Sequence, residues 1–396
     1  MKVPVSGKVI NDQDKDYAHQ AVNDGWLTEG RWSLRFQAAF SNYMGVRKTI
    51  LTNSGSSANL IALSALTSIE LGERRILPGD EVITTALNFP TTLNPILQIG
   101  AVPVFVDVNL PTLVTDIERV ERAFSPKTKA VVLAHTLGYG YDCGTLAKWA
   151  REKNIFFVED CCDALGGETP QGKLGTFGDF ATFSFYPAHQ MTCGEGGAAI
   201  TGSPLLAKLA TSFRDWGRAC WCETGMDNTC GNRYGGEYDH KYQYDRIGYN
   251  LKLTDIQAAI LCSQLQKLDE FTLARRRNHK FLVDAFQWKG LDRYFDFVKD
   301  EGKDRLAWFG FTLTCKEGVD RNKLCRWLDG QGIGNRPVFA GNVLRQPAYK
   351  GIVHRTPDTL VNTDVAHERS FWVGCWHGLS VDQLEYMVER FVEYFK

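Results

Sequence analysis

The segment 184–197 places a histidine where proton-transfer chemistry is possible. It reads Ser-Phe-Tyr-Pro-Ala-His-Gln-Met-Thr-Cys-Gly-Glu-Gly-Gly, with the histidine at position 189. An imidazole titrates near neutral pH, so His189 can accept and donate protons in general acid–base catalysis. Upstream, Asp160 ends the predicted strand that begins with the apolar residues 155–158, and α/β proteins place ligand-binding groups at the carboxyl ends of strands. Its carboxylate can hold a protonated ring nitrogen, or it can simply cap a helix or form an ion pair.

A second group has the composition of a phosphate site. Gly55, Ser56 and Ser57 stand where a helical pattern begins, after an apolar run that ends near residue 51. The free N–H groups and the dipole at a helix N-terminus attract phosphate, and the two hydroxyls add donors. The same residues are also ordinary helix caps, so the pattern is informative only together with Asp160 and His189.

Four cysteines form a third candidate site. Their spacing is Cys-x57-Cys-x-Cys-x7-Cys, which lacks the paired Cys-x2-Cys of a zinc ribbon. Four thiolates can hold an iron–sulfur cluster, and the alternative is packing as small buried hydrophobic residues. The predicted ligands are Cys162, Cys220, Cys222 and Cys230.

Two further cysteines leave this ligand choice open. Cys161 adjoins Cys162, and successive side chains on an extended stretch point in opposite directions, so we expect only one of the two to face a cluster. Cys193 lies four residues after His189, where it either packs in the core or is sensitive to oxidation.

Composition narrows the class of protein. The 396 residues carry a formal net charge of −1, with 44% hydrophobic and 23% charged residues. This balance gives no basis for binding nucleic acid or an anionic membrane, and no apolar run is long enough to span a bilayer. We therefore expect a cytoplasmic enzyme whose eleven cysteines are reduced rather than paired in disulfides.

Apolar, β-branched runs alternate with helical patterns, which predicts an α/β fold with a mostly parallel sheet. We expect a large cofactor-binding domain over residues 1–275 and a small α+β domain over 276–396. The stretch 219–246 is rich in Gly, Asn, Tyr and charge and has no clear period. A loop of this length within a compact domain is often functional.

Taken in order, the phosphate turn, Asp160 and the segment 184–197 resemble fold-type I pyridoxal phosphate (PLP) enzymes of the nucleotide-sugar aminotransferase/dehydratase family. The resemblance covers nearly the whole chain and implies a seven-stranded sheet and a homodimer with shared active sites. It places Ser184 and the ring-stacking Phe89 at the cofactor, and Asn250 at the cofactor phosphate of the partner subunit. It also places Asp163 and Tyr186 near the reacting centre.

His189 stands where most of this family carry the lysine that forms an imine with the cofactor. The histidine-containing members resemble sugar 3-dehydratases that use untethered pyridoxamine phosphate (PMP), with the histidine as base. The cysteine spacing resembles one branch that also uses a [2Fe-2S] cluster and an NADH-dependent flavin/iron–sulfur reductase. That branch implies a CDP-linked 4-keto-6-deoxyglucose substrate and a role in 3,6-dideoxyhexose and O-antigen biosynthesis.

Three other functions remain open from the sequence. A PMP-dependent dehydratase of the GDP-4-keto-6-deoxymannose type needs no external electrons and would leave the four cysteines unexplained. An ordinary aminotransferase would need a lysine at position 189. An inactive regulatory relative would not need the carboxylate of Asp160 or the side chains of Ser184 and Asn250.

Overall fold

A computed structural model describes residues 1–222, 226–299 and 304–396. Its largest element is a seven-stranded sheet in the order β1-β9-β8-β5-β4-β2-β3. Strands β3, β2, β4, β5 and β8 run parallel, and β9 pairs antiparallel with both β8 and β1. The predicted α/β class with a mostly parallel seven-stranded sheet is confirmed. The strands are β1 Lys48–Thr52, β2 Glu81–Thr85, β3 Val102–Val106, β4 Thr128–Ala134, β5 Phe156–Asp160, β8 Phe180–Ser184 and β9 Gly197–Thr201.

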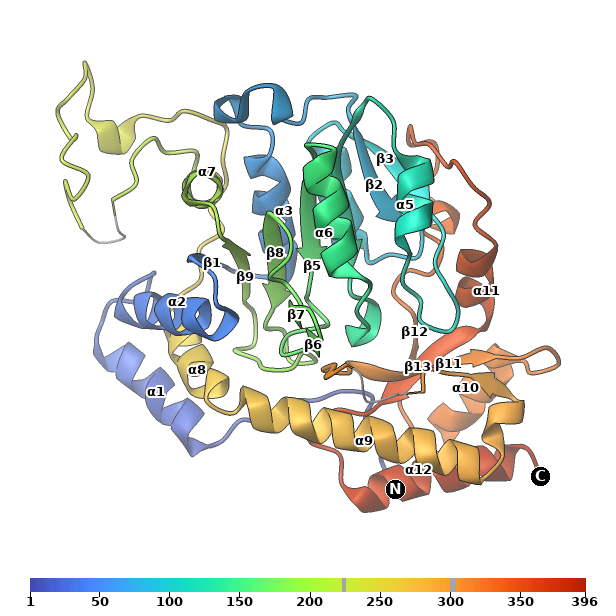
Figure 1. Cartoon of the computed structure of the whole chain (residues 1–396). Helices are drawn as coiled ribbons and strands as arrows, with labels where there is room; N and C mark the ends of the chain where they lie inside the picture. Colours follow the sequence, from blue (N-terminus) through green and yellow to red (C-terminus); the bar gives the residue numbers. More distant parts are fainter. Residues whose placement is uncertain (223–225, 300–303) are drawn as a thin grey trace.

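Both faces of this sheet are buried, as a parallel sheet requires. Within β5, Phe156 belongs to one buried cluster and Phe157 to the other, because successive side chains of a strand point to opposite faces. Helices cover both faces (Figure 1). The helices of this part of the chain are α1 Asp12–Asn23, α2 Arg31–Met44, α3 Gly55–Ala65, α4 Pro90–Gln98, α5 Ile117–Ala123, α6 Cys143–Glu152, α7 Pro204–Arg214 and α8 Asp255–Leu265.

A long helix, α9 (Leu268–Trp288), leads from this region to a four-stranded antiparallel sheet of order β10-β11-β13-β12 (Figure 1). The domain boundary predicted at residue 275 falls inside α9, and it stays a prediction.

The small sheet consists of β10 Phe295–Asp296, β11 Gly310–Cys315, β12 Asn335–Pro337 and β13 Ser370–Gly374, with helices α10 Arg321–Gly330, α11 Val361–Arg369 and α12 Val381–Tyr394. The short elements of the chain are β6 Glu168–Thr169, β7 Gly172–Lys173, η1 Ile69–Arg74, η2 Thr136–Gly138, η3 His240–Tyr242, η4 Leu291–Arg293, η5 Val343–Arg345 and η6 Pro347–Tyr349.

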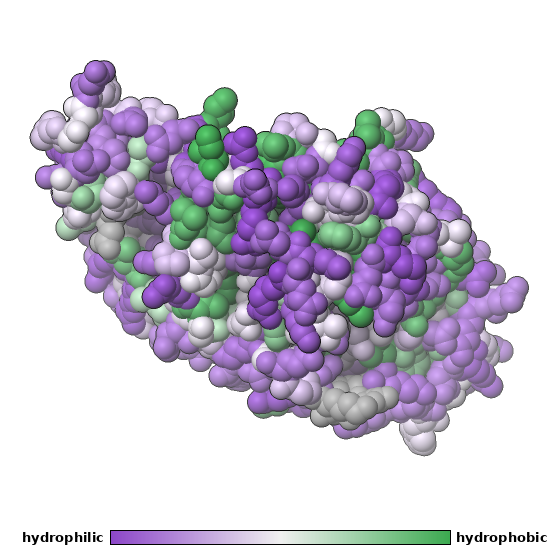
Figure 2. All heavy atoms as spheres, turned by 45° about the horizontal axis from the view of Figure 1, so that its top comes forward, coloured by the Kyte–Doolittle hydropathy of each residue, from purple (hydrophilic) through white to green (hydrophobic). Residues whose placement is uncertain are grey.

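The described residues of the irregular stretch 219–246 form an arm that projects beyond α7 (Figure 1). In its described residues the only regular element is the single turn η3. In the space-filling view the arm is a lobe at the upper left, with mainly hydrophilic residues on the face shown (Figure 2). Among the described residues, no helix combines the length and apolar character that crossing a bilayer requires.

One buried carboxylate joins the start of α2 to the start of α8. The N-cap of α2 is Gly30, which has no side chain to satisfy the free N–H groups of the first turn. Asp255, the first residue of α8, supplies the missing acceptor: it receives the N–H groups of Gly30, Trp32 and Ser33 at 2.8–3.1 Å. The Ser33 hydroxyl donates to the same carboxylate at 2.8 Å.

Replacing this carboxylate should destabilise the fold. We expect Asp255→Ala to lower the free energy of unfolding by about 3 kcal/mol, because it leaves several buried donors without an acceptor. Urea denaturation checks this value. A matched control is Asp12→Ala in α1, an exposed carboxylate paired with Lys15, which should cost under about 1 kcal/mol. Equal effects of the two substitutions would contradict the capping role of Asp255.

Candidate active site

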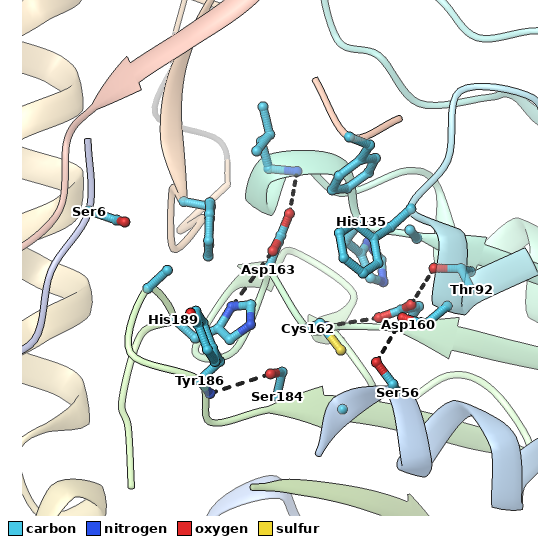
Figure 3. Close-up of a pocket in the computed structure, with 18 of the residues that line it drawn as sticks. Ser6, Ser56, Thr92, His135, Asp160, Cys162, Asp163, Ser184, Tyr186 and His189 are labelled. Atoms are coloured by element: carbon cyan, nitrogen blue, oxygen red, sulfur yellow. Dashed lines mark hydrogen bonds and ion pairs between the residues drawn. The ribbon is translucent and has the colours of Figure 1, made fainter. Parts of the chain in front are cut away.

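A cavity of about 650 Å³ lies between the carboxyl ends of the large-sheet strands and residues of the small sheet. Most of the residues predicted for the cofactor site line it (Figure 3). They are Gly55, Ser56, Phe89, Asp160, Asp163, Ser184, Tyr186 and His189. Residues that come from the small sheet or the segment before it include Phe309, Arg336 and Trp372. The cavity therefore combines groups from both sheets.

Asp160, the last residue of β5, is buried in this cavity and accepts hydrogen bonds from three donors. Its Oδ2 accepts from Asn59 Nδ2 at 2.8 Å and from Thr92 Oγ1 at 2.6 Å, and its Oδ1 accepts from the Cys162 N–H at 3.1 Å. These donors fix the orientation of the carboxylate within the cavity. Asn59 and Thr92 were not predicted, because each lies in an otherwise ordinary helix sequence.

The phosphate end of the cavity is the first turn of α3. Ser54 caps this helix by accepting the N–H of Ser57 at 3.1 Å, while Gly55 and Ser56 face the cavity. The Ser57 hydroxyl instead donates to Asn53 at 2.6 Å, so within this chain it supports the turn rather than lining the cavity. A Cβ at position 55 would lie 2.6 Å from the Cβ of Ser184, so only glycine lets the helix start approach β8 this closely.

His189 and Asp163 form a buried pair at the cavity wall. His189 Nδ1 lies 3.7 Å from Asp163 Oδ1 and has no hydrogen-bond partner within this chain (Figure 3). Burial, and then the positive charge of Arg275, lower the pKa of His189 to about 3. Burial, together with the negative charge of Asp160, raises the pKa of Asp163 to about 8. At neutral pH the imidazole is therefore unprotonated and the carboxyl group carries its proton.

Two residues that the sequence did not indicate hold this pair in place. Arg275, in α9, is fully buried and donates to the carbonyl groups of Ala188 and His189 at 3.0–3.3 Å. Gln190 donates to the Asp163 carbonyl at 2.5 Å. Arg275 comes from a run of three arginines on a helix, and nothing in that run distinguishes it from a solvated arginine.

The remaining predicted residues divide between the cavity and the surface. Phe89 and Tyr186 line the cavity yet are 48% and 52% exposed, so both stand at its open edge. Asn250 is exposed and accepts a hydrogen bond from Lys252 at 2.7 Å, and it does not line the cavity of its own chain. Its predicted place in the partner's site therefore stays a prediction.

The structure does not bring the four predicted cysteine ligands together. The thiols of Cys220, Cys222 and Cys230 lie within 4.8 Å of one another in the arm, and Cys162 is not in this group. Cys162 instead lines the cavity beside Ser184, with its sulfur toward the interior (Figure 3). Cys161 is fully buried in the core, so the expected opposite orientation of the two neighbours is observed.

The three arm thiols have the environment of metal ligands. The N–H of Cys222 donates to Cys220 Sγ at 3.5 Å, and the N–H of Cys230 donates to Cys222 Sγ at 3.4 Å. Partial burial opposes ionisation of Cys222, but hydrogen bonds with Thr229, Cys230 and Cys220 outweigh it and lower its pKa to about 6. Burial raises the pKa of the neighbouring Cys220 to about 11, so Cys222 is the thiol of this pair that ionises first. A thiolate is the form that binds metals, and the three thiols are close enough together to bind one metal site.

Comparison with known proteins agrees with this site. Residues 8–392 match the model of the DegT/DnrJ/EryC1/StrS aminotransferase family. The chain is 46% identical to the lipopolysaccharide biosynthesis protein RfbH of Salmonella typhimurium, over 99% of this chain and 92% of that protein. It is 45% identical to the dTDP-4-dehydro-2,6-dideoxy-D-glucose 3-dehydratase of Saccharopolyspora spinosa, over 98% of this chain and 86% of that protein.

A solved structure shares the fold along the whole chain. It is a histidine-to-asparagine mutant of GDP-4-keto-6-deoxymannose-3-dehydratase with bound GDP-perosamine, 26% identical, with a TM-score of 0.89. The match covers 98% of this chain and all of that one. This protein therefore belongs to the DegT/DnrJ/EryC1/StrS aminotransferase family.

Proposed function

We propose that this chain is a PMP-dependent 3-dehydratase of a nucleotide-linked 4-keto-6-deoxyhexose in deoxysugar and O-antigen biosynthesis. The observation that carries the proposal is His189, a buried, unprotonated imidazole that faces the cavity where a lysine amine would tether PLP. The relatives named as 3-dehydratases and the lipopolysaccharide biosynthesis protein support this class of reaction.

The cavity fits the cofactor. The carboxylate of Asp160 is placed to accept a protonated pyridine nitrogen, and the α3 N-terminus with Ser56 offers donors to a phosphate. Phe89 stands at the cavity edge where it can cover a ring, and Ser184 supplies a hydroxyl at the end of β8. When bound, the cofactor supplies an electron sink that allows a hydroxyl to leave the adjacent sugar carbon.

The His189–Asp163 pair is suited to move one proton at the buried wall of the cavity. Because Nδ1 faces Asp163, Nε2 is the nitrogen left to accept a proton from the reacting carbon. Protonation of His189 would place a positive charge beside a carboxyl group whose ionisation could offset it. The imidazole can then return the proton to the departing 3-hydroxyl. Tyr186 lines the cavity and is half exposed, which supports a role in contacting the sugar.

We further propose that the arm thiols hold a [2Fe-2S] cluster that receives electrons from an NADH-dependent flavin/iron–sulfur reductase. Reduction of the dehydrated sugar needs two electrons, and an iron–sulfur centre transfers them singly. The arrangement of Cys220, Cys222 and Cys230 supports this proposal. We also propose a homodimer in which Asn250 of one copy contacts the cofactor phosphate of the other.

The proposed substrate is CDP-4-keto-6-deoxyglucose, which makes the chain a CDP-4-keto-6-deoxy-D-glucose-3-dehydrase. One similar protein is named for a dTDP-linked sugar, which makes dTDP a second candidate for the nucleotide of the substrate. Turnover assays with CDP-, dTDP- and GDP-linked 4-keto-6-deoxy sugars decide between them. Equal or no turnover of all three sugars would contradict the proposed substrate. If the 3-hydroxyl is released and the final product forms without an electron donor, the result would favour the cluster-free GDP-type enzyme.

Removal of the imidazole should stop proton transfer but not cofactor binding. We expect His189→Asn to slow solvent-deuterium exchange at the PMP methylene at least about 100-fold, the usual contribution of a general base. Absorbance titration with PMP should give a dissociation constant close to that of the wild type. His19→Asn, on the exposed face of α1, is the matched control. Exchange at the wild-type rate would contradict the role of His189 as base.

Removal of one arm thiol should separate dehydration from reduction. We expect Cys220→Ser to lose iron and the 3-deoxy product while solvent-isotope incorporation into the sugar continues, because the thiol lies outside the cavity. The measurement pairs product analysis with the isotope-exchange assay. Loss of both activities in a protein that still folds and binds PMP would show that the two steps are not separable.

The buried carboxyl group predicts a pH-dependent stability. The pKa of Asp163 rises from its ordinary 3.8 to about 8 on folding, so its stabilising effect is full below 3.8 and is lost as pH rises to 8. The lowered pKa of His189 has the opposite effect on stability, but only at pH values below its ordinary pKa of 6.5. Between pH 6.5 and 8, the Tm of the cofactor-free wild type should therefore fall relative to that of Asp163→Asn. Parallel Tm curves over this range would contradict the raised pKa.

A further inference from the structure

The cavity has one strong positive charge that the proposed proton transfer does not use. Among the described residues that line the cavity, Arg336 is the single lysine or arginine. It lies in β12 of the small sheet and is exposed. Its one hydrogen bond within the described part of the chain runs from Nη1 to the carbonyl of its neighbour Asn335, at 2.7 Å. The guanidinium therefore keeps most of its donors free for a bound anion.

The small sheet holds the backbone of Arg336 in a fixed place. Arg336 of β12 pairs with Trp372 of β13, so the two side chains lie on the same face of the sheet. The Trp372 indole donates to the Pro337 carbonyl at 3.1 Å. The preceding Asn335 is buried, and its amide donates to the Cys325 carbonyl at 3.1 Å. Both Arg336 and Trp372 line the cavity, so the face that they share is turned toward it.

A series of rings leads from the reacting centre to this strand. The ring centroids of His189 and Phe309 are 5.2 Å apart, and those of Phe309 and Trp372 are 5.4 Å apart. Arg336 stands next to Trp372 on the neighbouring strand. The first turn of α3, which is proposed to bind the cofactor phosphate, belongs to the large-sheet side of the cavity. The cavity thus offers two separate places for an anion, one from each sheet.

The N-terminal segment adds a hydroxyl group to the cavity wall. Backbone hydrogen bonds of Val3, at 2.8 and 2.9 Å, attach this segment to the chain just before β12. Ser6 follows three residues later and lines the cavity. In the close-up view, Ser6 lies on the opposite side of His189 from Asp160 (Figure 3). Its hydroxyl is therefore available to a molecule that extends past His189, away from the cofactor ring.

A second arginine of the same region shows the contrast. Arg345, in η5, pairs with Asp364 at 2.8 Å and with Glu368 at 2.9 Å. It does not line the cavity. The charge of Arg345 is therefore neutralised within the chain, whereas none of the described carboxylates lies within ion-pair distance of Arg336.

We propose that Arg336 binds the diphosphate of the nucleotide sugar, with a further hydrogen bond from the Ser6 hydroxyl. This inference rests on the proposed function, which supplies a nucleotide-linked substrate. The planar guanidinium can donate to two phosphate oxygens at once, and a hydroxyl can donate to another. A diphosphate held at this wall keeps the sugar between itself and the cofactor, where His189 can reach it. Arg336 is thus a substrate-positioning residue that takes no part in proton transfer.

The test measures nucleotide binding to the full-length, PMP-loaded protein by isothermal titration calorimetry. The wild type should bind CDP more tightly than CMP, because CDP carries the second phosphate. Arg336→Gln should weaken CDP binding by about 10- to 100-fold, the range for charged hydrogen bonds, and remove most of the difference between CDP and CMP. Arg336→Lys keeps the charge without the fork and should fall in between. The pair dTDP and dTMP covers the second candidate nucleotide.

Two further variants complete the set. Ser6→Ala should weaken binding of the diphosphate by about 3-fold, as expected for loss of one hydrogen bond to a neutral donor. Arg345→Gln is the matched control and should bind CDP like the wild type, because its partners lie outside the cavity. In turnover assays, Arg336→Gln should raise the KM for the nucleotide sugar and leave the dissociation constant of PMP unchanged.

The outcomes separate this inference from the proposed function. If Arg336→Gln keeps the wild-type ratio of diphosphate to monophosphate affinity, or if Arg345→Gln loses as much affinity, the assignment of Arg336 is wrong. The dehydratase proposal then still stands on the exchange assay with His189→Asn. If the wild type binds neither CDP, dTDP nor GDP and turns over none of their 4-keto-6-deoxy sugars, the proposed function is wrong and this inference with it. The PMP affinity of each variant, followed by absorbance, reports whether the cavity has survived the substitution.

Discussion

The buried guanidinium of Arg275 is the interaction on which the site depends. It lies in α9, the helix that leads from the large sheet to the small one, and donates to the carbonyl groups of Trp308 and Phe309 on one side and of Ala188 and His189 on the other. A buried charge without acceptors would cost several kcal/mol, so the chain must keep these carbonyls together. One side chain therefore joins the backbone at His189 to the segment that leads into β11.

That positive charge also has an electrostatic effect on the proton-transfer pair. Its field disfavours a second positive charge on His189 and adds to the effect of burial. Asp163 experiences the same burial but lies near the carboxylate of Asp160, so it keeps its proton. Two titratable groups with opposite shifts therefore meet as a neutral pair. A neutral pair can be buried in a cavity without the desolvation cost of an ion pair, and it still has one proton to give and one site to receive.

The sequence was most informative where one chain segment carries a whole chemical pattern. The strand-end position of Asp160, the helix start at Gly55 and the segment around His189 are local features, and each lies at the cavity where it was expected. Asn59, Thr92 and Arg275 could not be identified in this way, because their roles arise from contacts between residues 33 to 101 positions apart. The same limit applies to the cysteines. Spacing grouped Cys162 with the arm thiols, whereas the structure groups only Cys220, Cys222 and Cys230 and has Cys162 at the cavity.

The separation of the arm from the cavity constrains how electrons could reach the sugar. Within one chain, the three arm thiols lie outside the cavity, and none of the described residues of the arm lines it. The arm is continuous with Asn250, which also lies outside its own cavity and is proposed to enter that of the partner. A chain segment that carries Asn250 into the partner's site brings the preceding arm toward the same site. Electron delivery in the proposed dimer would then run from the arm of one copy to the cavity of the other, while proton transfer stays with His189 and Asp163 of the chain that forms the cavity.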